Sequence, residues 1–139
     1  MLLLDTHAPL WVVRGEALAR AALDPVVVAQ EAGTLYVSAI TAWELGVAES
    51  KRTNRPELGM TPGVWFRHAL RTTGAKLATI TPVIAVEAAS VPAVYGRGDP
   101  GDCFLIATAR VRRLCLVTRD GPMLRLAATR SSYVQAVEC

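Results

Sequence analysis

Several features that mark other classes of protein are missing from this sequence. No run of apolar residues reaches the ~18 that a membrane-spanning helix needs, and the chain opens on a strand-like Met1-Leu2-Leu3-Leu4 rather than on a basic leader with a hydrophobic region. The three cysteines, Cys103, Cys115 and Cys139, are odd in number and have neither disulfide nor zinc spacing. We therefore expect a cytoplasmic protein that is not bound to a membrane and whose thiols are reduced and buried.

Familiar catalytic patterns are missing as well. The sequence has no glycine-rich phosphate loop, and no Ser-His-Asp or Cys-His set can be recognised around its histidines. Aromatic residues make up only 6% of the chain, and Trp11, Trp43 and Trp65 fall on helical apolar stripes. These tryptophans are predicted to lie in the core rather than to stack on nucleic-acid bases.

The chain does have the composition of one compact domain. Its 139 residues are 52% hydrophobic and 19% charged, which is enough to bury a core as a single domain over residues 1–139. The net charge is +3. The basic residues gather in local groups, namely Lys51-Arg52-Thr53-Asn54-Arg55, Arg67 with Arg71, Arg110-Val111-Arg112-Arg113, and Arg125 with Arg130. Such groups either attract a polyanion such as nucleic acid or form ordinary solvated helix faces, and charge alone leaves both interpretations open.

Short apolar runs alternate with helical patterns along the whole chain. Strands are predicted at residues 2–4, 35–37, 77–80, 114–117 and 133–137, and the last of them is expected at an edge. Parallel strands need crossover connections, which the intervening helices supply. The sequence therefore predicts an α/β protein with a doubly wound, mostly parallel five-stranded sheet.

Helices are predicted at residues 7–20, 26–32, 39–51, 64–73, 82–90 and 121–128, with a further helix beginning near Asp102. Asp24-Pro25 is expected to cap the second of them, and residues 91–99 form a connector. On the helix over 39–51, Ile40, Trp43 and Val47 form an apolar stripe. Glu44 is spaced to face inward or to the edge of the core beside this stripe, where a carboxylate needs a partner.

Acidic residues occur at the predicted ends of strands and beginnings of helices. Asp5 and Asp120 follow strands, and in parallel sheets ligands bind beyond those carboxyl ends. Whether Glu44 and Asp102 reach the same edge is not fixed by the pattern. Carboxylates that share a cleft repel one another unless a cation lies between them. Mg²⁺ or Mn²⁺ prefers such oxygen ligands and can activate a water against a phosphodiester.

Each acid also has a purely structural interpretation. Asp102, Asp5 or Asp120 can cap a helix or shape a turn, and Asp99 before Pro100 is a common turn pair. Glu44 is the hardest to explain in this way. Neighbouring hydroxyls can support a metal site or simply cap helices, and they belong to Thr6, Ser38 and Thr118.

Four motifs occur together and in order. They are Leu3-Leu4-Asp5-Thr6-His7, Val37-Ser38 through Trp43-Glu44-Leu45, Asp99-Pro100-Gly101-Asp102 with Leu105-Ile106-Ala107-Thr108-Ala109, and Leu116-Val117-Thr118-Arg119-Asp120. In these motifs the chain resembles the PIN domain family, specifically the VapC-type toxins of type II toxin–antitoxin systems. The resemblance spans almost the whole chain.

This resemblance implies a three-layer α/β/α sandwich and a metal-dependent ribonuclease. The implied catalytic acids are Asp5, Glu44, Asp102 and Asp120, of which Asp5, Asp102 and Asp120 hold Mg²⁺ or Mn²⁺, and Asp99 supports them. It also implies an RNA substrate, a cognate antitoxin and a homodimer. Candidate contacts to the RNA backbone are Lys51, Arg52, Arg112 and Arg113. Gly101 stands where the family often has a bulkier aromatic residue, and Cys103 where a basic residue is common.

Other α/β proteins fit the sequence less well. A phosphoacceptor signalling module needs an aspartate at the end of the third strand, where this chain has Thr79-Ile80-Thr81. A haloacid-dehalogenase-like phosphatase needs a second aspartate at the position of His7. A catalytically silent PIN-like module that acts through partner binding stays open as an alternative.

Replacing Asp5 or Asp102 by asparagine is expected to leave the thermal stability of the protein unchanged or raised, because one repelling charge is removed.

Overall fold

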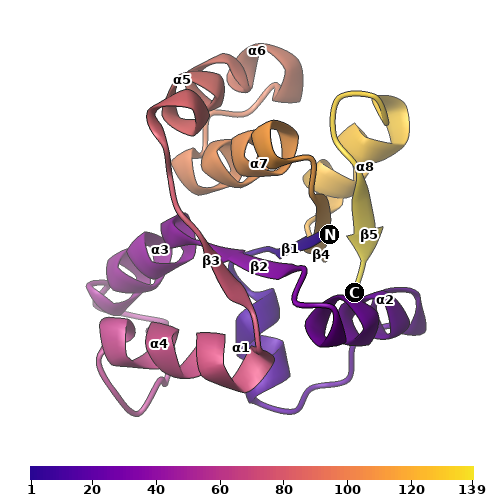
Figure 1. Ribbon diagram of the computed structural model, residues 1–139. Coiled ribbons are helices and arrows are strands. Elements are labelled where there is room, and N and C mark those ends of the chain that lie inside the picture. The colour runs from indigo at the N-terminus through magenta and orange to yellow at the C-terminus, as the bar shows by residue number, and fades with distance from the viewer.

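The computed structural model describes residues 1–139, apart from the side chain of Ala21. Its centre is a five-stranded sheet in the order β3-β2-β1-β4-β5, and all neighbouring strands run parallel (Figure 1). The strands are β1 (Leu2–Leu4), β2 (Leu35–Ser38), β3 (Lys76–Ala78), β4 (Cys115–Thr118) and β5 (Ala136–Glu138). The predicted parallel sheet is confirmed, with β5 at one edge.

Helices cover both faces of this sheet (Figure 1). They are α1 (Ala8–Val13), α2 (Arg20–Glu31), α3 (Ala39–Glu49), α4 (Pro62–Thr73), α5 (Pro82–Ser90), α6 (Pro92–Tyr95), α7 (Pro100–Arg112) and α8 (Gly121–Thr129). Side chains alternate along a strand, so Leu3 enters the core beneath α5, α7 and α8, while Leu2 and Leu4 pack with α1, α2 and α4. The result is the three-layer α/β/α sandwich. No helix in the described part of the chain is long and apolar enough to cross a membrane.

Two predicted helices near the N-terminus have different bounds in the structure. The helix expected over 7–20 ends at Val13, because Gly15 turns the chain with φ +69°. The helix expected over 26–32 begins at Arg20, so Pro25 lies inside α2 instead of at its start. Ala22, Val26 and Ala29 are all buried. Packing of this continuous apolar face therefore outweighs the backbone hydrogen bond that Pro25 cannot donate.

The apolar stripe expected on α3 is wrong in part. Trp43 and Val47 are 50% and 41% exposed, and the buried residues of this helix are Ile40, Thr41 and Leu45. The helix is rotated because its inner face packs against both α4 and α7. Trp65, in contrast, is buried as predicted. An exposed tryptophan therefore stands directly beside Glu44.

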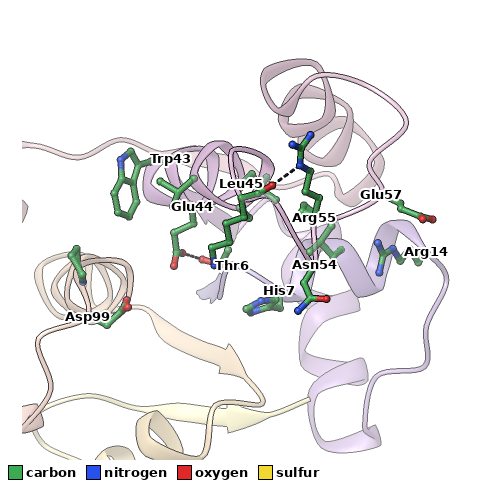
Figure 2. A pocket seen from close by; sticks show the side chains of 16 residues that line it. Thr6, His7, Arg14, Trp43, Glu44, Leu45, Asn54, Arg55, Glu57 and Asp99 are labelled. Carbon is green, nitrogen blue, oxygen red and sulfur yellow. Dashed lines mark hydrogen bonds between the residues drawn. The ribbon is translucent and has the colours of Figure 1, made fainter.

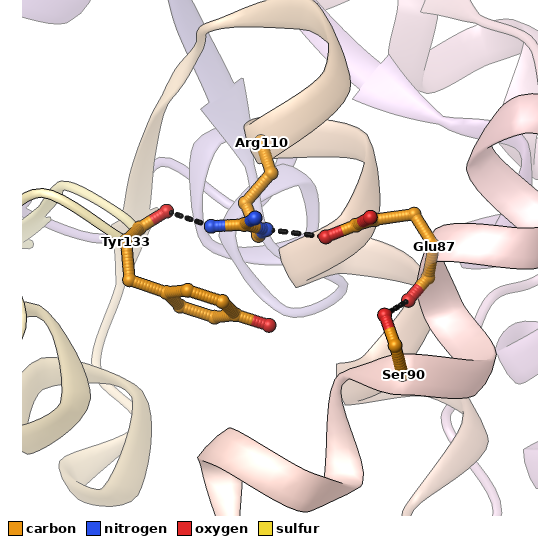
Figure 3. A network of polar contacts seen from close by, with 4 residues as sticks. All are labelled: Glu87, Ser90, Arg110 and Tyr133. Atoms are coloured by element: carbon orange, nitrogen blue, oxygen red, sulfur yellow. Dashed lines mark hydrogen bonds and ion pairs between the residues drawn. The ribbon is translucent and has the colours of Figure 1, made fainter.

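Arg110 belongs to a basic group in the sequence but is used inside the fold. Its guanidinium donates hydrogen bonds to Glu87 Oε1 of α5 (2.5 Å) and to the Tyr133 carbonyl (2.7 Å), and it lies 3.6 Å above the Tyr133 ring (Figure 3). These contacts join α7 to α5 and to the segment before β5. They fix the last turn of α7, and Asp102 lies in the first turn of the same helix.

All three cysteines are free thiols. Cys103 and Cys139 are buried and Cys115 is half-buried. Burial raises the pKa of all three thiols, and that of Cys139 to about 11. Such thiols stay protonated at neutral pH and pack as small apolar groups.

Candidate functional site

The carboxyl ends of β1, β2 and β4 lie level with one another. Leu4 is paired with Val37 on one side and with Val117 on the other, so Asp5 follows β1 at the same edge where β2 and β4 end. From β1 the chain continues to β2 and β3 on one side, and from β4 it continues to β5 on the other side. The strand order therefore reverses between β1 and β4, which is the switch point of the sheet. Open α/β sheets bind their ligands in the crevice at such a point.

Asp5 is fixed in place by three hydrogen bonds and is only 5% exposed. Its carboxylate accepts the backbone N–H groups of His7 (2.8 Å) and Ala8 (3.1 Å) and the hydroxyl of Thr118. The same Thr118 oxygen accepts the N–H of Asp120 at 2.9 Å. Thr118 therefore joins the acid that follows β1 to the acid that follows β4.

Asp120 and Asp102 are bridged by a residue that the sequence analysis did not single out. The hydroxyl of Tyr95 donates to Asp102 Oδ2 at 3.0 Å and lies 3.5 Å from Asp120 Oδ1. Asp120 also caps α8, because its Oδ1 accepts the Met123 N–H at 2.8 Å. Tyr95 ends α6, a short helix inside the predicted connector, and no pattern in the sequence pointed to it.

Asp99 and Asp102 have distinct positions at the start of α7. Asp99 is the N-cap, and its carboxylate accepts the Asp102 N–H at 3.1 Å. The structural interpretation that Asp102 caps the helix is therefore wrong. Since Asp99 satisfies the helix end, the Asp102 carboxylate is free to face Tyr95 and Asp120.

Glu44 reaches the cluster from α3. Its carboxylate accepts the Thr6 hydroxyl (Figure 2). Its Oε1 occupies the space that a Cβ atom on Gly101 would take. Gly101 is buried against this carboxylate. A side chain at position 101 would displace Glu44, so glycine there gives α3 and α7 their close approach at the site.

Charge at the cluster is poorly compensated. Burial raises the pKa of Glu44, as do the neighbouring Asp99 and Asp102 carboxylates, against the hydrogen bond from Thr6. Burial likewise raises the pKa of Asp102 against the hydrogen bond from Tyr95, with Asp99 and Asp120 adding to the effect and Arg97 opposing it. The pKa of Tyr95 is also raised, first by burial and then by Asp102. Tyr95 is therefore a neutral hydrogen-bond donor between two acids.

The donor set fits a hard divalent cation that keeps part of its water shell. Among the described residues, no three Asp, Glu, His or Cys side chains are placed as a ready-made cage for a metal ion. Mg²⁺ and Mn²⁺ are usually held by one or two carboxylates, with water supplying the other ligands. An all-oxygen cluster meets that requirement, since burial raises the pKa of its Glu44 and Asp102 carboxyl groups and the neighbouring acids add to the effect.

A groove of about 860 Å³ opens beside Glu44 and Asp99 (Figure 2). Its walls come from α1, α3 and the loop after α3, and they include Trp43. Arg14 and Arg55 stand at the far end of the groove from Asp99 (Figure 2), and Lys51 also lines it. We call this the α1–α3 groove. Three acids line it as well, namely Glu44, Glu57 and Asp99, so the groove as a whole carries no net formal charge.

The other candidate residues from the sequence are placed as follows. Ser38 is buried and caps α3 by accepting the Ile40 N–H at 3.2 Å, so it positions the helix of Glu44 without touching an acid. Arg52 is exposed and lies outside the lining of the α1–α3 groove. Arg112 and Arg113 lie at the opposite end of α7 from Asp102, where Arg112 stacks on Tyr36. The structure does not bring these two arginines to the carboxylates.

A family model named PIN domain matches residues 2–128 of the chain. The chain belongs to the PIN domain family. A comparison with curated proteins gave no match. The fold of this PIN domain is shared by solved structures of low sequence identity, which at this level shows the fold alone.

Three of these structures cover nearly the whole chain. The DNA-bound VapBC from Salmonella typhimurium is 18% identical with a TM-score of 0.63, over 99% of this chain and 98% of that one. VapBC2 from Rickettsia felis, bound to a DNA fragment from its promoter, is 12% identical with a TM-score of 0.66 over 99% and 97%. A toxin–antitoxin complex from Klebsiella pneumoniae is 22% identical with a TM-score of 0.59 over 99% and 96%.

Proposed function

We propose that this PIN domain is a metal-dependent endoribonuclease and the toxin of a type II toxin–antitoxin pair. One observation carries the enzymatic part of the proposal. Acids that are far apart in the sequence meet at the switch point of the sheet. Burial and the neighbouring acids raise the pKa values of Glu44 and Asp102 in spite of nearby basic side chains. The folds of the VapBC and toxin–antitoxin structures support the assignment to a toxin.

In this proposal Asp5, Asp102 and Asp120 hold Mg²⁺ or Mn²⁺. The cation would lower the pKa of a bound water and stabilise the negative charge on the leaving oxygen of a phosphodiester. Glu44 would accept the proton of the attacking water, because its carboxylate is held by the Thr6 hydroxyl and faces the groove through which the substrate would reach the cluster. Thr118 and Tyr95 orient the acids, as hydrogen-bonded partners of metal ligands do.

The α1–α3 groove would bind the RNA strand on its way to the cluster. Lys51 lines it and Arg52 follows directly, and such side chains contact phosphates without selecting a sequence. Trp43 is exposed at its rim and presents an aromatic face on which a base can stack. In this assignment Arg112 and Arg113 contribute only to the general positive potential of the surface.

We further propose that the chain forms a homodimer and is inhibited by a cognate antitoxin. Apolar side chains stand exposed on α2, namely Leu23, Val27 and Val28. Their spacing puts them along one side of the helix, as in a surface that another protein covers. A co-expressed small protein that co-purifies with the chain and suppresses its cleavage of RNA is the expected finding.

The direct test is cleavage of a labelled RNA with a single-stranded loop by the purified chain. We expect cleavage with Mg²⁺ or Mn²⁺ and none in EDTA, with activity restored when the cation is returned. A silent module would leave the RNA intact under every condition. Equal cleavage with and without EDTA would contradict the role of the cation.

Tyr95→Phe tests the bridge between Asp102 and Asp120. The variant keeps the ring and removes the only group that donates to both acids in the described structure. We expect about a tenfold higher Mn²⁺ concentration for half-maximal cleavage, since outer partners of metal ligands typically contribute 10–100-fold to affinity. Tyr133→Phe is the control, because no hydrogen bond of the Tyr133 hydroxyl is present among the described residues. Unchanged Mn²⁺ dependence in Tyr95→Phe would remove the bridge from the site.

A further inference from the structure

A second hollow of about 390 Å³ lies on the surface between α6 and α8. It shares no residue with the α1–α3 groove. We call it the arginine groove, and the side chains that matter here are Tyr95, Arg97, Pro122, Arg125, Leu126 and Arg130. Three of its lining residues, Arg97, Arg125 and Arg130, are basic and none is acidic, which suits a site for an anionic chain.

The guanidinium groups of this groove are not used by the fold. In the described structure Arg97, Arg125 and Arg130 are exposed, and their side chains make no ion pair or hydrogen bond with the protein. Arg110 and Arg119 differ from them, since both are bonded to carbonyls or carboxylates. The free donors of the arginine groove are therefore available to a ligand.

The arginine groove borders the carboxylate cluster. Tyr95 lines the groove and donates to Asp102 at 3.0 Å, so one residue belongs to both. Arg125 folds back to the first turn of α8, where its Nη1 lies 3.1 Å from the position that a Cβ atom on Gly121 would take. Gly121 directly follows Asp120, and its missing side chain lets a guanidinium approach the start of that helix.

We propose that the arginine groove binds phosphates of the RNA strand next to the bond that is cut, on the side of the cluster away from the α1–α3 groove. The proposal rests on the proposed function, because it places the ligand beside the hydrolytic site. Guanidinium groups match phosphate oxygens with paired donors, and they give affinity without reading bases. The strand then contacts basic residues in both grooves while the acids between them face the phosphodiester.

The test measures binding of a fluorescent single-stranded RNA by anisotropy in EDTA, where cleavage does not interfere. We expect the double variant Arg125→Gln with Arg130→Gln to bind at least about tenfold more weakly than the wild-type chain. The slope of log K against log salt should become shallower by about 1.4, since each lost contact to a single strand contributes about 0.7. The control removes the same charge from α4 through Arg67→Gln with Arg71→Gln, and it should keep the wild-type affinity and slope.

Arg97→Gln is a second variant on the opposite wall of the groove, and it should weaken binding as well. Melting temperatures of all variants show that they are folded. Equal RNA binding by the groove variants and the α4 control would overturn the inference. It would also be overturned if the groove variants bound RNA normally but no longer bound an acidic protein partner. Absence of cleavage together with arginine-dependent RNA binding would instead reject the nuclease proposal and leave the arginine groove standing.

Discussion

Asp102→Asn should abolish cation-dependent cleavage of RNA while the variant melts in EDTA at the wild-type temperature or above it. Asparagine keeps the size of the side chain, and its amide oxygen can still accept the Tyr95 hydroxyl. The lost carboxylate is a proposed metal ligand, so kcat/KM should fall by more than the 10–100-fold typical of an outer partner.

The expected stability follows from the electrostatics of the cluster. Burial and the neighbouring Asp99 and Asp120 raise the pKa of the Asp102 carboxyl, so its charge is unfavourable in the metal-free protein. Removing that charge relieves the repulsion. The side chain is only half-buried, and the gain is therefore expected to be small.

Thermal unfolding with and without Mn²⁺ provides the measurement. A cation that binds only the folded state raises the wild-type melting temperature, and Asp102→Asn should lose most of that rise. Asp24→Asn, an exposed acid of α2, is the control and should behave as wild type. Wild-type cleavage in Asp102→Asn would remove this acid from the mechanism, and an unchanged Mn²⁺ shift would remove it from the metal site.

Asp5 is not equivalent to Asp102 in this respect. From the sequence, replacing either acid by asparagine is expected to relieve repulsion and to leave thermal stability unchanged or raised. In the structure Asp5 is almost fully buried and accepts two backbone N–H groups and the Thr118 hydroxyl. Asparagine offers one oxygen fewer as an acceptor, and a buried donor left unpaired costs about 1–3 kcal/mol. Asp5→Asn should therefore lose stability, and Asp102→Asn is the cleaner probe.

The sheet and the strand-end acids could be predicted because their signals are local. Continuous apolar runs such as Leu2–Leu4 mark strands that are buried on both faces, and Asp5 and Asp120 follow two of them. Ser38 as a helix cap follows the same logic, and the structure confirms it at the start of α3. Topology then brings the strand ends to one edge.

Features that depend on contacts between distant segments were not predictable. Trp43 was expected in the core, but α3 turns its inner face to α4 and α7, and a helical period alone does not fix that rotation. Tyr95 lies in a stretch without a clear pattern, and only the docking of α6 beside α7 and α8 makes it a bridge. The sequence shows that Gly101 departs from the usual residue of the family. Its role became clear only from the structure, where the Glu44 carboxylate occupies the space of a Cβ atom on Gly101.

Gly101→Ala should lower cleavage by about 100-fold although it adds a single methyl group. The new Cβ would enter the space that the Glu44 carboxylate occupies, so Glu44 must rotate away from Thr6 and the neighbouring acids. The obstacle is the end of a flexible side chain, and alanine favours the helix over glycine by roughly 0.5–1 kcal/mol. The protein should therefore stay folded with stability close to that of the wild type, while activity is lost.

Gly98→Ala is the matched control, because a Cβ there meets open space and the residue lies just before the same helix. It should keep wild-type activity. If Gly101→Ala acts through Glu44, its effect should not add to that of Glu44→Gln. The double variant should then cleave RNA no more slowly than the less active of the two single variants. Additive losses would show that the methyl group blocks substrate instead, and full activity in Gly101→Ala would show that the position of Glu44 against Gly101 is not needed for the chemistry.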